Sequence, residues 1–460
     1  MTAVTADTSV LKALKKIRMP QKQRNRELAL LLFACALSGA AFSLVQLGAL
    51  GTLDPLILAI GGVLAVLVLA LHVVLRFVAS DADPFVLPIA TLLTGLGIAM
   101  IYRIDIAQRN TGWDAYSTKQ LAWTALSVAG AIALVIALRN YRVLYRFTYV
   151  SGLAGILLLV LPFIPGLKAE GSNADVWVSI PGLFAFQPGE LAKICLAVFF
   201  AGYLVRTRES LASVGKRFLG ITWPRMRELG PVLVVWVLSL AIIVSQRDLG
   251  TGVLIFGMFI AMLYVATGKT SWVLIGLTGV AVGAFLATRI LEYVRGRFRN
   301  WLDAFNPEVI AADGGSYQLV EGIFGLAHGG LIGTGWGQGR PYVTPLAHSD
   351  YIIPSLGEEL GIVGLFAILC LYMVFVSRGL RIGLAGQDDF GKLLATGLSF
   401  TIALQVFIMV GGVTRVIPLT GLTTPFLAAG GSSLIANWLV VALLLRISDA
   451  VRRQPRVVIG

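Results

Sequence analysis

The chain has 460 residues, of which 57% are hydrophobic and 13% are charged, and its formal net charge is +13. A soluble globular domain has about 25% charged residues, so the composition excludes a soluble enzyme or binding module. Apolar stretches of about 20 residues recur along the chain, and each can cross a bilayer as a helix. The sequence therefore predicts an all-α polytopic membrane protein. Its basic residues indicate cytoplasmic loops near anionic headgroups rather than nucleic-acid binding.

The first apolar stretch follows a polar N-terminus that ends near residue 26. No small-residue cleavage site follows that stretch, so we expect a membrane span and not a signal peptide. Three cysteines, Cys35, Cys195 and Cys370, lie separately in apolar runs and are interpreted as core residues, not as a disulfide framework or a metal site.

Twelve spans are predicted from the apolar runs. They are 27–50, 54–78, 84–104, 119–138, 143–166, 188–206, 230–246, 249–267, 271–291, 353–377, 391–413 and 424–447. An even number places both termini on one side of the membrane. The segments 12–26, 206–228 and 452–456 are strongly basic and share that side, which the positive-inside rule assigns to the cytoplasm.

This topology places four segments outside, namely 172–190, 245–251, the long loop 291–351 and 414–425. The long loop carries four arginines, Arg295, Arg297, Arg299 and Arg340. An anionic ligand at the outer surface would explain such a cluster, and anchoring to lipid headgroups is the alternative.

Ionisable residues inside spans are costly and are therefore functional candidates. Glu190 falls in the first turn of a predicted helix that Pro188 opens, and Lys193 lies three residues further on the same face. The two either form a structural ion pair or line a polar cavity. Asp248 lies between two spans and fits a helix N-cap as well as a functional carboxylate. His72, in an apolar run, is predicted to make a helix–helix hydrogen bond.

Further polar residues gather at the outer ends of the last three spans. They are His348, Asp350, Glu358 and Glu359, then Thr420 and Thr424, and then Ser432 and Ser433. Their convergence on the side of the long loop indicates an outward-facing cavity.

The long loop contains the sequence AADGGSYQL (311–319). Two glycines after Asp313 let the backbone approach a ligand, and Tyr317 and Gln318 offer hydrogen-bonding groups. A carboxylate beside arginines can act as a general base while the cations stabilise an anionic leaving group. The alternative is that Asp313 only forms a turn.

Six motifs in order resemble the SEDS family of bacterial cell-wall synthesis, which includes RodA and FtsW. They are GIAMIYRID (97–105), FQPGELAK (186–193), QRDLGT (246–251), GSYQLVEGIFGLAHGGLIGTG (315–335), AHSDYIIPSLGEELG (347–361) and PLTGLTTPFLAAGGSSLI (418–435). The resemblance implies a peptidoglycan glycosyltransferase that polymerises lipid II and releases undecaprenyl pyrophosphate. RodA-type enzymes, which act in elongation, resemble the chain more than FtsW-type division enzymes do.

The resemblance also implies roles for individual residues. Asp313 takes the place of the essential loop aspartate, and Glu190, Lys193 and Asp248 line a cavity beneath the loop. The spacing between Asp313 and Tyr317 is two residues shorter than in the family, so Asp303 and Glu308 are kept as alternatives. Arg247 replaces a proline, and it either keeps Asp248 ionised or contacts pyrophosphate.

The expected organisation is a SEDS-type ten-helix core with two extra N-terminal helices. The boundaries are a basic tail (1–26), two extra helices (27–80), a glycosyltransferase domain (81–449) with an extracellular loop (292–352), and a C-terminal tail (450–460). The expected partners are lipid II, the membrane and a class B penicillin-binding protein, whose transpeptidase crosslinks the glycan. No cofactor is expected, and a divalent cation assisting the leaving pyrophosphate is kept as an alternative. A lipid II flippase and a scaffold are the competing functions.

Overall fold

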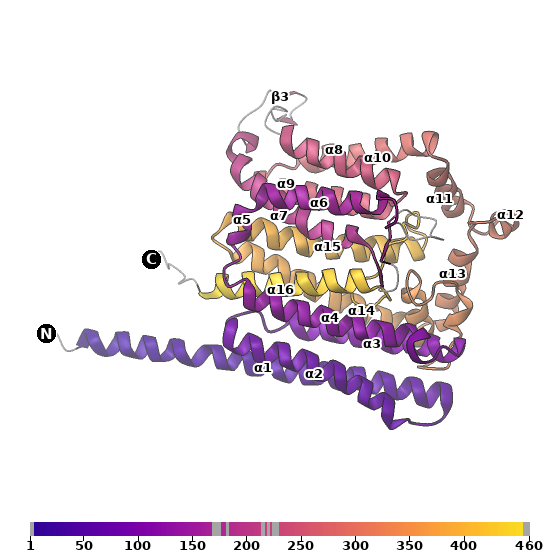
Figure 1. Cartoon of the computed structure of the whole chain (residues 1–460), viewed down its shortest axis with the longest axis horizontal. Helices are drawn as coiled ribbons and strands as arrows, with labels where there is room; N and C mark the ends of the chain where they lie inside the picture. The colour runs from indigo at the N-terminus through magenta and orange to yellow at the C-terminus, as the bar shows by residue number, and fades with distance from the viewer. Residues whose placement is uncertain are drawn as a thin grey trace.

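The computed structural model describes residues 4–167, 176–180, 184–212, 217–218, 221–222 and 230–453. Its helices run side by side in one bundle (Figure 1). The N-terminal half contains α1 (Val4–Leu50), α2 (Pro55–Val78), α3 (Val86–Gln108), η1 (Gly112–Asp114), α4 (Tyr116–Ala137), α5 (Val143–Arg146), α6 (Thr148–Val160), η2 (Leu161–Phe163) and α7 (Pro188–Ala212). The C-terminal half contains α8 (Gly230–Ser245), α9 (Leu249–Thr267), α10 (Ser271–Ile290), α11 (Glu292–Leu302), α12 (Pro307–Ala311), α13 (Tyr317–Gly329), η4 (Pro341–Val343), α14 (Ile352–Ala385), α15 (Asp389–Val413) and α16 (Gly431–Arg453).

Two short antiparallel hairpins accompany the helices. One pairs β1 (Val178–Ile180) with β2 (Phe184–Phe186), and the other pairs β3 (Arg217–Phe218) with β4 (Ile221–Thr222). The predicted basic segments 206–228 and 452–456 lie largely outside the described residues.

Ten helices in the described part of the chain are long and apolar enough to cross a membrane, so the class of polytopic helical membrane protein is confirmed. These are α1, α2, α3, α4, α7, α9, α10, α14, α15 and α16. The other two predicted spans fall on α6 and α8, apolar helices of 13 and 16 residues. Helix α6 is short because the chain leaves helical geometry at Phe147, which separates it from α5.

Both ends of the described chain lie at the same end of the bundle, and α1 extends beyond the other helices there (Figure 1). The predicted tail up to residue 26 thus continues the first span as one helix. Helices α1 and α2 lie along α3 and α4 at one edge of the bundle. His72 makes the predicted helix–helix contact, because its Nδ1 lies 2.7 Å from Oε1 of Glu27 in α1.

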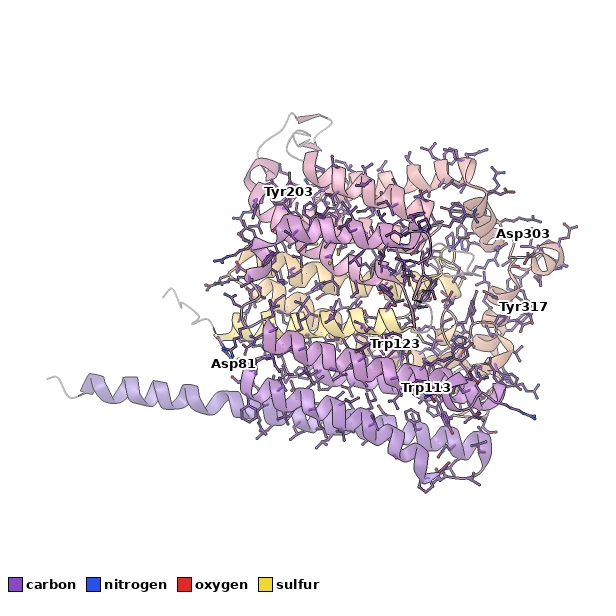
Figure 2. All side chains as sticks on the ribbon, viewed as in Figure 1. Asp81, Trp113, Trp123, Tyr203, Asp303 and Tyr317 are labelled. Carbon is purple, nitrogen blue, oxygen red and sulfur yellow. The ribbon has the colours of Figure 1, made fainter. Side chains whose placement is uncertain are left out.

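The segment between α10 and α14, which was predicted as one long loop, contains regular structure. It forms α11, α12, α13 and η4 at the end of the bundle opposite to the termini (Figure 1). Local sequence features explain why two of these helices form. Asn306 caps α12, and Pro307 occupies its first position. Helix α13 is amphipathic. Figure 2 shows Asp303 and Tyr317 at this end and Asp81 at the other.

The glycine-rich stretch 328–339 closes a break in α14. Gly361 has a φ of 69° inside that helix, and the freed amide groups of Ile362 and Val363 donate to the carbonyls of Gly330 and Leu331 at 3.0 and 3.1 Å. A side chain on Gly361 would place its Cβ 2.3 Å from the Gly333 nitrogen. These glycines therefore permit close backbone packing.

Candidate active site

A cavity of about 570 Å³ lies at the end of the bundle that carries α11, α12 and α13. Its walls come from α11, the loop before α13, the start of α13 and the segments before α14 and before α16. The lining residues are Arg297, Asn300, Trp301, Ala312, Asp313, Gly314, Gly315, Ser316, Tyr317, Gln318, Leu319, Pro345, Leu346, Asp350, Tyr351, Leu419 and Gly421. This volume is in the range of ligand pockets.

The loop that presents Asp313 is held by two hydrogen bonds that involve the residues following Asp313. Asn300 of α11 donates from Nδ2 to the Gly314 carbonyl at 2.8 Å, and Ser316 donates from Oγ to the Ala304 carbonyl at 2.6 Å. Gly314 has a φ of 66°, and a Cβ on Gly315 would lie 2.0 Å from the Val309 carbonyl oxygen. The backbone there accepts only glycine, which leaves the exposed Asp313 side chain at the cavity wall.

Arg297 and Asp350 lie in the same cavity as Asp313. Arg297 donates from Nη1 to the Leu419 carbonyl at 3.0 Å, which joins α11 to the segment before α16. Burial raises the pKa of the Asp350 carboxyl to about 6, and the positive charge of Arg297 opposes this rise. The cavity thus contains two carboxyl groups in different environments, one exposed and one half-buried.

The two alternative carboxylates of the long loop are outside this cavity. Asp303 ends α11 and accepts a hydrogen bond from Asn306 Nδ2 at 2.8 Å, while Glu308 is exposed in the first turn of α12. Neither side chain is among the lining residues.

Glu190 and Lys193 are buried in α7 and form an ion pair of 2.8 Å. They line a second, separate cavity of about 20 Å³, room for a single water molecule. Lys193 also donates to Gln405 Oε1 of α15 at 3.2 Å. Thr401 of α15 and Asn437 of α16 complete the polar part of the lining.

Asp248 and Arg247 occupy the turn between α8 and α9. Asp248 caps α9 and accepts a hydrogen bond from the Thr251 amide at 3.0 Å, and the charges of Glu190 and Lys193 act on its carboxyl. Arg247 is exposed and has a φ of 61°, which is uncommon for a residue other than glycine. Asp248 therefore belongs with the α7 pair, and neither residue lines the larger cavity.

Ser432 and Ser433 begin α16 and connect it to neighbouring segments. Ser432 Oγ accepts from the Gln187 amide at 2.8 Å, directly before α7. Ser433 Oγ accepts from Thr423 Oγ1 at 2.8 Å and from Asn437 Nδ2 at 3.3 Å. This chain of polar groups leads from the start of α16 to the small cavity.

His348 stacks on Tyr116 with ring centroids 3.9 Å apart. Burial lowers the pKa of His348, and the charge of Asp105 opposes this change. Its ring is not in the wall of either cavity. Glu358 and Glu359 also lie outside the walls of both cavities. Glu359 pairs with Arg103 at 3.0 Å, and Glu358 accepts a hydrogen bond from the Arg340 amide at 2.8 Å.

Several residues of the two cavities were missed by the sequence interpretation. Gln405 and Asn437 are polar residues within apolar spans, a signal that could have found them. Asn300 and Gly421 had no such signal, because their place in the wall follows from the packing of the long segment. In the chain ranges described above, no group of three or more His, Cys, Asp or Glu side chains is arranged to hold a metal ion.

Fold and site together define a multi-pass membrane protein with a polar cavity at one end of its helical bundle. The family model FTSW_RODA_SPOVE, described as cell cycle protein, matches residues 84–453. This chain belongs to that family, the SEDS proteins.

Two relatives differ in how much of the chain they match. Peptidoglycan glycosyltransferase RodA of Mycobacterium tuberculosis is 44% identical over 94% of this chain and 92% of its own length. A probable peptidoglycan glycosyltransferase FtsW of Geobacter metallireducens is 32% identical over 81% of this chain and 96% of its own. The mycobacterial match covers 94% of this chain, so it includes most of the segment that forms α1 and α2. That segment precedes residues 84–453, which the family model matches.

Two solved structures share the fold. A chain from a peptidoglycan synthase complex, described as coordinating polymerization and crosslinking, has a TM-score of 0.63 at 23% identity over 81% of this chain and 99% of that chain. The Thermus thermophilus rod shape determining protein RodA has a TM-score of 0.57 at 22% identity over 83% of this chain and all of that one.

Proposed function

We propose that this protein polymerises lipid II into glycan strands at the outer face of the cytoplasmic membrane, with Asp313 as the catalytic base. The chain is a RodA-type peptidoglycan glycosyltransferase, as its 44% identity to the mycobacterial enzymes over 94% of its length supports. The observation that carries the role of Asp313 is its position at the wall of the large cavity, which Asp303 and Glu308 do not reach.

The reaction joins two lipid-linked sugars. The C4 hydroxyl of the acceptor attacks the anomeric carbon of the donor, and the bond from that carbon to the pyrophosphate oxygen breaks. Asp313 takes the hydroxyl proton, and undecaprenyl pyrophosphate leaves with the bonding electrons. The rigid loop, held by Asn300 and Ser316, fixes the base before the substrate arrives. Arg247, exposed at the α8–α9 turn, offers a cation for the pyrophosphate.

The membrane arrangement that fits this reaction has twelve spans, counting α6 and α8, with both termini in the cytoplasm. Ten helices among the described residues reach spanning length, and both described chain ends lie at the bundle end opposite to the cavity. The large cavity then opens to the outside, where the substrate's sugars are found. The lipid part remains in the bilayer.

The proposed partner is a class B penicillin-binding protein, whose transpeptidase crosslinks the new glycan. The fold similarity to a chain from a peptidoglycan synthase complex supports such an assembly.

The experiment that tests the function is glycan polymerisation from lipid II by the purified protein with a class B penicillin-binding protein. Wild type is expected to make glycan, and Asp313→Asn is expected to bind lipid II but make none. Asp303→Asn and Glu308→Gln serve as matched controls and should remain active. If Asp313→Asn is active and one of the two control variants is inactive, the catalytic base is the residue changed in that control. Transport of lipid II without polymerisation would support the flippase instead.

A further inference from the structure

Arg297 and Asp350 approach the same point of the large cavity without touching each other. Two terminal nitrogens of Arg297 and Oδ2 of Asp350 each lie 3.9 Å from the position that a Cβ on Gly421 would occupy. Gly421 has a φ of 75°, which favours glycine. The point above Gly421 is therefore an open corner of the cavity, with a cation and a carboxyl group facing it.

Among the described residues, the Arg297 guanidinium and the Asp350 carboxyl do not use all of their hydrogen-bonding atoms. The charge of Arg297 acts on the Asp350 carboxyl, but among the described residues these two side chains do not form an ion pair. Arg297 uses Nη1 for the Leu419 carbonyl, which leaves further donors on the guanidinium. A ligand that bridges the two side chains can use these remaining hydrogen-bonding groups.

The charges in the corner limit what that ligand can be. A phosphate would be attracted by Arg297 but repelled by Asp350, so the two effects oppose each other. A neutral ligand that accepts from Arg297 and donates to Asp350 satisfies both. Adjacent hydroxyl groups on a sugar ring, or a hydroxyl next to an acetamido group, provide a hydrogen-bond acceptor and a donor side by side.

We propose that Arg297 and Asp350 form a sugar-binding corner, which orients a neutral ring of the substrate beside Asp313 and does not hold the pyrophosphate. This inference rests on the proposed function, since it names the part of the substrate that the corner recognises. Arg297 and Asp350 are positioning residues in this scheme, and Asp313 performs the proton transfer.

The test measures ligand binding separately from turnover. Purified full-length protein in detergent is titrated with N,N′-diacetylchitobiose, a neutral disaccharide, and with inorganic pyrophosphate, using ligand-observed NMR. We expect the disaccharide to bind wild type and to bind Asp350→Ala and Arg297→Gln at least about tenfold more weakly. Asp350→Asn, which keeps the shape, should weaken binding several-fold. Arg299→Gln is the matched control, because Arg299 is exposed on the same helix and outside the cavity wall.

Pyrophosphate distinguishes the two ligand classes. Its binding is expected to be unchanged by Arg297→Gln. If Arg297→Gln abolishes pyrophosphate binding while disaccharide binding is unchanged, the corner is a phosphate site and the proposal is wrong. Equal disaccharide binding by wild type, Asp350→Asn and Arg297→Gln would also refute it.

Glycan synthesis by the same preparations separates this proposal from the proposed function. Disaccharide binding that depends on Arg297 and Asp350, without any glycan from wild type, would leave the corner standing and refute the polymerase. If wild type makes glycan but disaccharide binding does not depend on Arg297 or Asp350, the polymerase function stands and the sugar-binding corner is refuted.

Discussion

Asn300 Nδ2 donates a 2.8 Å hydrogen bond to the carbonyl oxygen of Gly314, directly after Asp313. This bond fixes the position of the proposed base relative to α11. We expect Asn300→Ala to lower kcat for glycan synthesis by about fivefold, because one lost hydrogen bond of about 1 kcal/mol lets the loop move away from its working geometry. The initial rate at saturating lipid II measures this effect.

Asn140→Ala is the control for that change. Asn140 also bonds a backbone group through its side chain, the Arg142 amide at 3.1 Å, in the α4–α5 connection at the other end of the bundle. Its kcat should equal that of wild type. A normal kcat in Asn300→Ala would show that the loop keeps its place without this bond.

Removal of one partner of the Glu190–Lys193 ion pair is expected to destabilise the protein at α7. Glu190→Gln leaves the Lys193 ammonium buried without its partner, which costs about 3–5 kcal/mol. The thermal unfolding midpoint in detergent should fall clearly. A double change to methionine, which removes both charges, should recover most of the loss.

Asp389→Asn provides the comparison, because Asp389 pairs with Arg208 on the surface. Exposed pairs contribute about 0–1 kcal/mol, so its midpoint should change little. If the double methionine variant is as unstable as Glu190→Gln, the pair has a role beyond mutual neutralisation, such as binding the substrate.

The helices and the grouping of polar residues toward one end of the bundle could be predicted because hydropathy and charge act locally along the chain. The division into two cavities could not. Glu190 was expected in a cavity beneath the loop that carries Asp313, yet Gln405 and Asn437 enclose the α7 pair, and this depends on how α15 and α16 pack. The break in α14 at Gly361 was also missed, because an apolar run gives no sign of a positive φ.

Gly361→Ala is expected to disrupt the contact between α14 and the 328–339 segment. The new Cβ would collide with the Gly333 backbone, 2.3 Å away, and the φ of 69° is unfavourable for alanine. Together these effects cost more than about 1 kcal/mol, so the unfolding midpoint should fall. Gly62→Ala in α2 is the control: nothing lies within 4 Å of its Cβ position, so this change should leave the midpoint unchanged or raise it.

The pH dependence of substrate binding is expected to follow Asp350. Its pKa of about 6, raised by burial, means that the carboxylate form dominates at neutral pH and is lost as the pH falls through about 6. An ionised acceptor makes a stronger hydrogen bond than a protonated one, so KM for lipid II should rise by up to about tenfold below pH 6. Asp350→Asn should have a raised KM that does not change across this range.

The rise in KM at low pH is not explained by unfolding that protonation of Asp350 would cause. Because the pKa of Asp350 is higher in the folded protein than its ordinary value of 3.8, the folded state binds this proton more tightly. The contribution of Asp350 to the free energy of unfolding therefore falls as the pH rises from about 4 to about 6, and acidification favours the folded state at this residue. A KM that rises in acid while the unfolding midpoint is unchanged identifies a binding effect, whereas the same acid-induced rise in Asp350→Asn would assign it to another group.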